Sequence, residues 1–150
     1  MATGDRIIAG AARTIAGVDH RDKGRFMQYR LIETPHRTVV VDGPGSAIGS
    51  DRDASDLVSA ALSDDAEAVA VTVERLDRAF FDLSTGIAGT LAQKCVQYRL
   101  FFAVIGDVSK YEEESDSFAG LVLEARRGRG QLAFVADLDE LWSRLATMRR

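Results

Sequence analysis

The segment Asp82-Leu83-Ser84-Thr85 brings a carboxylate and two hydroxyls together at the predicted start of a long helix. Backbone N–H groups in the first turn of a helix have no intrahelical partner, and the helix dipole favours negative charge there. Such a position can bind an anion, and a hydroxyl in it can carry a phosphate. A simpler interpretation is that Asp82 caps the helix, with Ser84 and Thr85 as polar residues of its first turn. Asp82, Ser84 and Thr85 are therefore the candidate regulatory or anion-binding residues.

Three further carboxylates, Asp42, Glu74 and Asp107, each follow a predicted strand directly. The carboxyl ends of parallel strands share one rim of the sheet, which is where open α/β sheets place ligand sites. Carboxylates gathered there could hold Mg²⁺ or serve a small enzyme, although strand-end aspartates are also frequent turn formers. These three are the candidate rim carboxylates. We expect no metal site, no cofactor and no catalytic residue beyond this possibility.

Other reactive side chains lack the partners that their chemistry requires. His20 and His36 have no cysteine or histidine at metal-ligand spacing. Cys95 is the single cysteine, which excludes an internal disulfide and predicts a buried core residue. The sequence contains no phosphate-binding loop, no dinucleotide-binding glycine motif and no nucleophile elbow. The chain therefore fits a non-enzymatic protein better than an enzyme, but the sequence does not decide the question.

The elements that would position these residues begin with strands. Met27, Tyr29 and Leu31 alternate with polar residues, the period of a half-buried strand. A polar stretch before them predicts a hairpin with a weak strand near residues 13–18. Thr38–Val41 is rich in β-branched residues and ends in a turn cluster. The front of the chain therefore predicts antiparallel strands.

After residue 49 the pattern changes to helices alternating with short apolar strands, whereas the acidic segment 109–116 indicates a loop. Such alternation predicts a parallel sheet with right-handed crossovers, covered by helices on one face or on both. We expect about four helices, at roughly residues 50–62, 83–98, 118–125 and 138–145, and strands at 68–73, 100–105 and 131–135. The fold class is therefore α/β, with a mixed sheet.

Gly86 and Gly89 lie within the predicted helix 83–98. Each glycine weakens a helix by about 1 kcal/mol relative to alanine. That cost predicts the close approach of another helix, a ligand or a second subunit, so a homodimer is one expectation.

Residues 80–106 resemble a bacterial family of uncharacterised STAS-like domains. The resemblance is carried by FFDLSTGIAG at residues 80–89, by Gln93-Lys94 and Tyr98-Arg99, and by the apolar strand that follows. The stretch DRDASDLV at residues 51–58 fits the same family, and the resemblance extends over roughly residues 37–145. It implies a STAS-like mixed sheet and no particular chemistry, because these domains are uncharacterised.

The wider STAS class includes anti-sigma-factor antagonists, which are small regulatory domains. In them a strand is followed by a turn similar to Phe-x-Asp-Ser-Ser-Gly, and a partner kinase phosphorylates the serine after the aspartate. Phe80-Phe81-Asp82 resembles this turn, but the next position here is Leu83, which cannot accept phosphate. Ser84 lies one residue further on, and Thr85 two. The resemblance implies a regulatory module and leaves open whether either hydroxyl is phosphorylated.

Length and composition restrict the remaining possibilities. The chain has 150 residues, 46% of them hydrophobic, which suits one globular domain. We expect a flexible N-terminal arm at residues 1–12 and a single STAS-like domain at 13–150. The formal net charge of −4 argues against nucleic-acid binding. No apolar run is long enough to span a membrane and no signal peptide is evident, so we expect a cytoplasmic location without membrane contact.

The sequence thus supports two functions of different classes. The first is a non-enzymatic regulatory or protein-interaction module whose partner is another protein and whose working surface includes Asp82, Ser84 and Thr85. The alternative is a small-molecule or anion-binding protein, or a small enzyme, that uses the rim carboxylates. A homodimer through Gly86 and Gly89 is compatible with either function.

Overall fold

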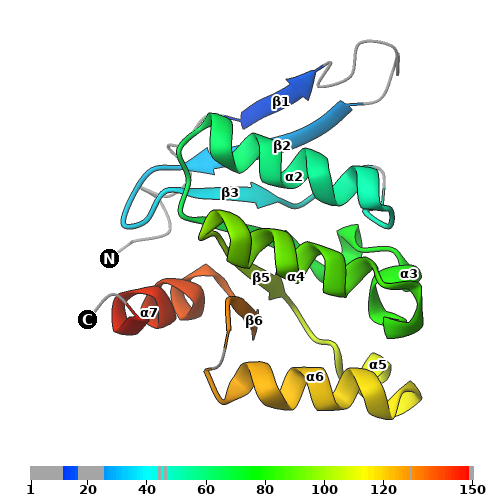
Figure 1. Cartoon of the computed structure of the whole chain (residues 1–150). Helices are drawn as coiled ribbons and strands as arrows, with labels where there is room; N and C mark the ends of the chain where they lie inside the picture. The colour runs from blue at the N-terminus through cyan, green and yellow to red at the C-terminus, as the bar shows by residue number, and fades with distance from the viewer. Residues whose placement is uncertain (1–11, 17–25, 44, 46, 129, 149–150) are drawn as a thin grey trace.

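The protein is described by a computed structural model that covers residues 12–16, 26–43, 45, 47–128 and 130–148 (Figure 1). Its core is one six-stranded sheet in which the spatial order of the strands equals their order in the chain. The strands are β1 (Ala12–Ala16), β2 (Phe26–Ile32), β3 (Thr38–Val41), β4 (Ala68–Thr72), β5 (Phe101–Ile105) and β6 (Leu132–Val135). The α/β fold class is therefore confirmed.

The sheet is mixed, as the change of pattern along the sequence predicts. β1 pairs with β2 and β2 with β3 in antiparallel fashion, whereas β3–β4, β4–β5 and β5–β6 are parallel. The expectation that residues 68–73 and 100–105 share a sheet is confirmed, since Ala68 pairs with Phe101 and Val71 with Val104. The polar stretch that would turn the first hairpin lies outside the described residues.

Within the residues that the structure describes, four longer helices occupy the predicted regions and two short helices accompany them. Ser50 begins the first long helix by accepting a hydrogen bond from the Asp53 backbone N–H at 3.1 Å, as its capping pattern predicts. The helices are α2 (Asp51–Ser63), α3 (Arg78–Phe81), α4 (Ile87–Tyr98), α5 (Ser109–Glu114), α6 (Asp116–Arg126) and α7 (Leu138–Met148), with 3₁₀ turns η1 (Val73–Arg75) and η2 (Leu83–Thr85).

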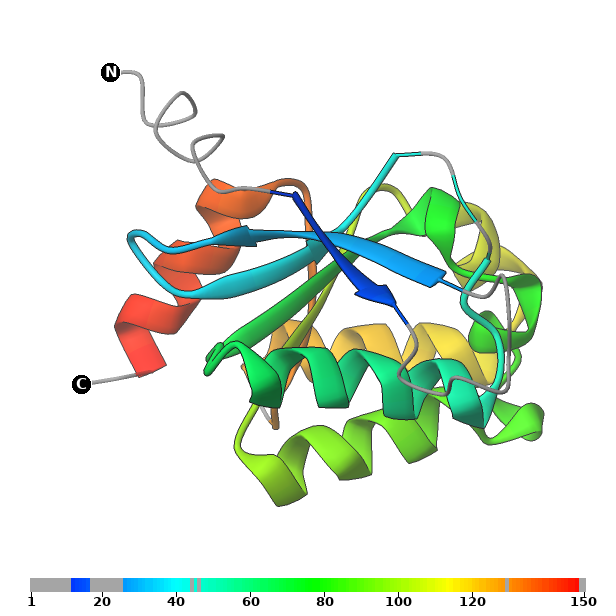
Figure 2. The same ribbon diagram turned by 90° about the horizontal axis from the view of Figure 1, so that it is seen from above.

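The longer helices cover both faces of the sheet, unequally. A crossover connection between two parallel strands is right-handed. Each crossover here leads to the neighbouring strand on the same side, so the parallel part of the sheet extends in one direction from β3 to β6. Consequently α2, α4 and α6 lie on one face, whereas α7, which follows the last strand, lies on the other (Figure 2). The sequence pattern left this distribution open.

The two faces of the sheet have different side chains. The face under α2, α4 and α6 carries valine and phenylalanine, for example Val71 and Phe102, whereas the face under α7 is rich in alanine, for example Ala70 and Ala103. Small side chains let α7 approach closely. The buried Trp142 of α7 fills this space and donates from its indole Nε1 to the Thr38 hydroxyl at 3.3 Å.

One expectation about local structure was wrong, and another concerns residues that mostly lie outside the described part of the chain. Residues 109–114 form the helix α5 and not a loop, and Asp107, just before it, accepts from the Ser109 backbone N–H, a donor that has no partner within the helix. The expected arm at residues 1–12 lies outside the described residues except for Ala12, which belongs to β1. In the described part of the chain, no helix has the length and apolar character needed to cross a membrane.

Candidate functional site

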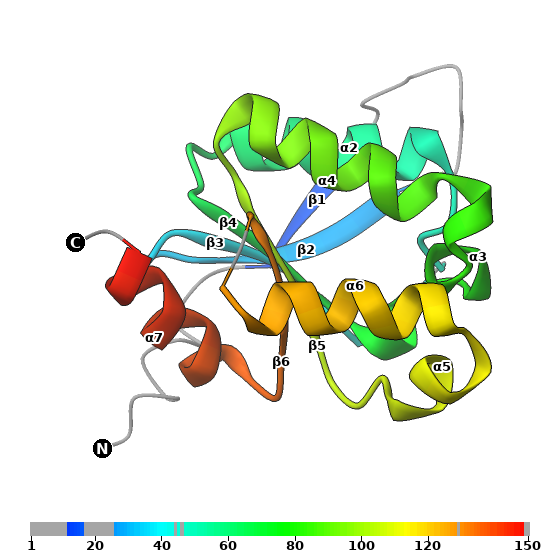
Figure 3. The same cartoon turned by 60° about the horizontal axis from the view of Figure 1, so that its bottom comes forward.

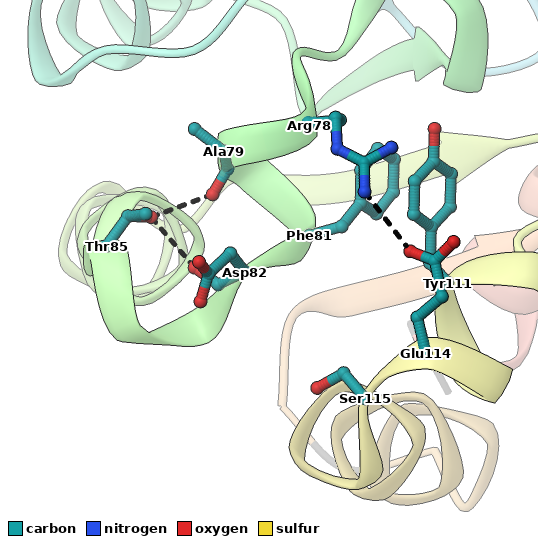
Figure 4. A pocket seen from close by; sticks show the side chains of 8 residues that line it. All are labelled: Arg78, Ala79, Phe81, Asp82, Thr85, Tyr111, Glu114 and Ser115. Atoms are coloured by element: carbon teal, nitrogen blue, oxygen red, sulfur yellow. Dashed lines mark hydrogen bonds and ion pairs between the residues drawn. The ribbon is translucent and has the colours of Figure 1, made fainter.

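An open pocket of about 490 Å³ lies beyond the carboxyl ends of β4 and β5. One wall comes from α3 and η2, which follow β4, and the other from α5 and the start of α6, which follow β5 (Figure 3). We call it the α3–α5 pocket; it is lined by Arg78, Ala79, Phe81, Asp82, Thr85, Tyr111, Glu114 and Ser115 (Figure 4). This is the end of the sheet where open α/β proteins bind ligands.

The chain after β4 is fixed in place before it enters the pocket. The Ile48 backbone N–H donates to the Arg75 carbonyl at 2.7 Å, and the Asp77 N–H donates to the Ile48 carbonyl at 2.9 Å. These bonds tie the loop after β3 to the segment that precedes α3. Phe80, which is 1% exposed, then anchors α3 in the core below.

An aromatic cluster forms the base of the pocket. The rings of Phe81 and Tyr111 stack with centroids 3.7 Å apart and planes inclined by 5°. Phe118 meets Phe81 edge-on at 5.4 Å, and Phe134 of β6 meets Phe118 edge-on at 5.6 Å. Because these contacts continue into the core, the stack joins the two walls of the pocket through rigid packing.

The structure corrects the predicted start of the helix that follows Asp82. Residues 83–85 form the 3₁₀ turn η2, and α4 begins only at Ile87. The break occurs at Gly86, whose φ of 82° is left-handed and therefore favours glycine. Asp82 consequently caps the 3₁₀ turn and does not lie at the N-terminus of α4.

Asp82 and Ser84 form a closed local pair. Asp82 Oδ1 accepts from the Ser84 backbone N–H at 3.0 Å and from the Ser84 hydroxyl at 2.6 Å. These two hydrogen bonds lower the pKa of the fully exposed Asp82 carboxyl below its usual range. Ser84 is exposed and does not line the pocket, whereas Asp82 does. The carboxylate therefore remains charged at the edge of the pocket.

Two other polar side chains that line the pocket, Thr85 and Ser115, form hydrogen bonds with backbone atoms. The Thr85 hydroxyl donates to the carbonyl oxygens of Ala79, at 2.7 Å, and Asp82, at 2.8 Å. The Ser115 hydroxyl accepts from the Phe118 N–H at 3.1 Å and begins α6 as its N-cap. Both side chains therefore stabilise the shape of the pocket.

A salt bridge crosses the pocket from one wall to the other. The Arg78 guanidinium lies 3.5 Å from Glu114 Oε1 (Figure 4). Their side chains are 74% and 52% exposed, respectively. Exposed pairs of this kind contribute roughly 0–1 kcal/mol, so the bridge opens at little cost.

The rim carboxylates serve separate structural roles. Asp42 forms an ion pair with Arg30 at 2.7 Å, and its carbonyl accepts from the Arg75 guanidinium at 3.1 Å. Arg75 is only 4% exposed, and its burial lowers its pKa while the nearby Asp42 charge opposes that shift. Gly45 keeps this arrangement possible, because an added Cβ there would lie 2.7 Å from the guanidinium carbon.

Asp107 repeats the local pattern of Asp82, and Glu74 is exposed in η1. Asp107 Oδ1 accepts from the Ser109 N–H at 2.9 Å and from its hydroxyl at 2.5 Å, bonds that lower the Asp107 pKa. Within the described ranges, no three His, Cys, Asp or Glu side chains form a group that could hold a metal ion. The rim carboxylates do not line the α3–α5 pocket.

The sequence led to Asp82 and Thr85, but not to the residues facing them from the other wall. Tyr111, Glu114 and Ser115 were missed because their segment was interpreted as a loop, and Arg78 because the short helix α3 has no repeating apolar pattern. The pairing of Ser115 with the Phe118 N–H is a helix-start signal that indicates where α6 begins. The one available signal was that Phe81 and Tyr111 are aromatic residues beside polar segments, which is typical of a surface site.

Comparison with known protein families matches residues 33–145 to DUF4180, a domain of unknown function. The matched region is most of the chain and includes every residue that lines the α3–α5 pocket. Comparisons with curated proteins and with solved structures gave no match. The family therefore agrees with the expectation of an uncharacterised domain and assigns no chemistry.

Proposed function

Because the chain belongs to the DUF4180 family, we propose its function from the geometry of the pocket: a non-enzymatic regulatory module that binds another protein. The supporting observation is the open α3–α5 pocket of about 490 Å³, whose base is the stacked Phe81–Tyr111 pair. In this proposal, a side chain of the partner enters the pocket between η2 and α5. The relation to STAS regulators suggested by residues 80–89 remains a prediction and fits this role.

The polar groups of the pocket support binding better than catalysis. The Thr85 and Ser115 hydroxyls are engaged with backbone atoms and offer no activated nucleophile. Hydrogen bonds from Ser84 hold the Asp82 pKa low, whereas a general acid or base works best with a pKa near the operating pH. The arrangement can fix the position of a partner group without transforming it.

The exposure of the walls favours a protein over an enclosed small ligand. Sites for small molecules bury most of the ligand surface, whereas Arg78 and Glu114 here are 74% and 52% exposed. A pocket with such open edges receives one side chain while the rest of the partner covers its rim. Asp82 and Thr85, two of the candidate residues predicted from the sequence, line this pocket.

Site-specific crosslinking in the native cells tests this function. A photo-crosslinking variant, Arg78→p-benzoylphenylalanine, places the reactive group at the pocket edge. The matched control is Arg127→p-benzoylphenylalanine, because Arg127 also forms an exposed pair with a glutamate, at 3.3 Å. We expect a distinct protein adduct from position 78 and not from position 127, identified by mass spectrometry. No adduct at position 78, or the same adducts at both positions, contradicts the proposal.

A small-molecule-binding function is the second candidate, favoured by one observation. The pocket volume of about 490 Å³ falls in the range of small-molecule sites, roughly 300–1,000 Å³. Native mass spectrometry of the protein purified from its own cells distinguishes the two functions. A stoichiometric small ligand that Tyr111→Ala releases would favour this candidate over the partner protein.

A further inference from the structure

The charges around the α3–α5 pocket are mainly negative. Asp82 and Glu114 line it against the single lining cation, Arg78. Exposed Glu113 and Asp116 extend this charge along α5 and into the start of α6. A surface of this kind complements positive charge on a partner.

Asp82 has unused capacity to accept hydrogen bonds. In the described part of the chain, both of its side-chain hydrogen bonds, from the Ser84 N–H and hydroxyl, end on Oδ1. Oδ2 takes part in neither, so the carboxylate can accept a further donor. Because the Ser84 bonds favour the ionised form, this acceptor is charged at neutral pH.

The pocket has two other groups that can bind a cation, the Glu114 carboxylate and the Tyr111 ring, and each already has a cation of the chain beside it. Arg78 lies against Glu114 at 3.5 Å, and Lys110 Nζ lies 5.1 Å from the centre of the Tyr111 ring. Since Phe81 stacks on one face of that ring, Lys110 must lie over the opposite face. A carboxylate beside an aromatic ring suits an ammonium or guanidinium group, and the exposed internal cation Arg78 is weakly held.

Resting on the proposed function, we propose that the partner inserts an arginine or lysine side chain of a basic segment into the α3–α5 pocket. The incoming cation replaces Arg78 at Glu114 and reaches Asp82 Oδ2 on the facing wall. Arg78 therefore acts as an internal competitor. Its removal should strengthen binding of the partner, an outcome that simple loss of a contact residue would not produce.

The test uses the acetylated, amidated peptide Gly-Ser-Arg-Gly-Arg-Ser-Gly as the basic probe, followed by ¹H–¹⁵N NMR titration of the full chain. The control peptide carries citrulline in place of both arginines and has no charge. We expect the basic probe to shift the amide signals of residues 78–86 and 109–115, and the citrulline peptide to leave them unchanged. Raising the NaCl concentration from 50 to 500 mM should weaken the binding.

Four variants separate recognition in the pocket from general charge attraction. Arg78→Ala should tighten probe binding by up to about fivefold, the range set by an exposed ion pair, whereas Asp82→Asn and Glu114→Gln should weaken it. Asp82→Asn keeps an oxygen for the Ser84 bonds, so η2 stays intact. Arg127→Ala removes an arginine of another exposed Arg–Glu pair, which is 55% and 53% exposed, and should change nothing. Equal tightening by Arg78→Ala and Arg127→Ala overturns the inference.

The failure of this inference can be told apart from failure of the proposed function. A protein adduct at position 78 that forms equally in Glu114→Gln and at 500 mM NaCl would mean that a partner uses the pocket without a cation. The inference would then be wrong and the proposed function would stand. Absence of that adduct removes the proposed function, whatever the peptide does.

Discussion

Two glycines three residues apart should respond to the same substitution in opposite directions. Gly86 has a φ of 82° and links η2 to α4, whereas Gly89 lies in the first turn of α4. A Cβ added at either position would meet no other atom within 4 Å. Backbone conformation alone therefore decides the effect of Gly86→Ala and Gly89→Ala.

The magnitudes follow from the two conformations. Alanine in the left-handed region costs about 1–2 kcal/mol, so Gly86→Ala should lower the free energy of unfolding by roughly 1 kcal/mol. Alanine in a helix is favoured over glycine by about 0.5–1 kcal/mol, so Gly89→Ala should raise it by that amount. For a domain of this size, 1 kcal/mol shifts Tm by about 2–4 °C, so the two variants should differ by several degrees.

Urea denaturation followed by circular dichroism measures both free energies, and light scattering at several protein concentrations measures the oligomeric state. If Gly89→Ala destabilises the protein, or changes its oligomeric state, then something outside the single chain approaches Gly89. That result would refute the reasoning from open space and would favour the homodimer predicted from the sequence. Stabilisation without a change in mass means that Gly89 is not an interface glycine.

Two further predictions concern titration. Burial raises the pKa of the Cys95 thiol to about 12, so the folded protein keeps a proton that the unfolded chain releases above about pH 8.5. The free energy of unfolding should therefore fall between about pH 9 and 12, by up to about 1.4 kcal/mol per pH unit, relative to Cys95→Ala; parallel pH profiles of the two proteins would contradict this. Carboxyl NMR should give Asp82 a midpoint below that of an ordinary aspartate, and Ser84→Ala should raise it, because the Ser84 bonds favour the charged form. The stability that these bonds contribute is present above the pKa of Asp82 in the unfolded state and is lost as the pH falls through its pKa in the folded state. An Asp82 midpoint that Ser84→Ala leaves unchanged would refute the assignment of the low pKa to the Ser84 bonds.

Local pattern was sufficient to locate the strands and the four longer helices, but not the short helices α3 and α5. The β-branched residues of β3 predicted a strand in the antiparallel front of the chain, and the apolar runs of β4 and β5 predicted buried parallel strands. Ser50 marked the start of α2. These signals work because burial and capping depend on side chains close together in the sequence. The placement of α7 on its own face was not predictable in this way, since it depends on the direction in which successive crossovers advance.

The same reasoning predicted only some of the residues of the site. Asp82 was recognised because carboxylates near helix starts form a familiar pattern, but Gly86 moved that start by adopting a left-handed φ. Tyr111 and Glu114 are separated from Asp82 by a helix and a strand and meet it only through the neighbouring positions of β4 and β5. No local periodicity encodes such a meeting, and the buried Arg75 was missed for the same reason.

The agreement between spatial and chain order of the strands has a consequence for biosynthesis. A polypeptide emerging from the ribosome can add each strand to an edge that already exists, without waiting for a distant segment. The α3–α5 pocket belongs to the late part of this sequence, because its second wall and its Phe118 support follow β5. Binding of the proposed partner would thus require chains whose growth has passed α6, so shorter nascent fragments would not compete for it.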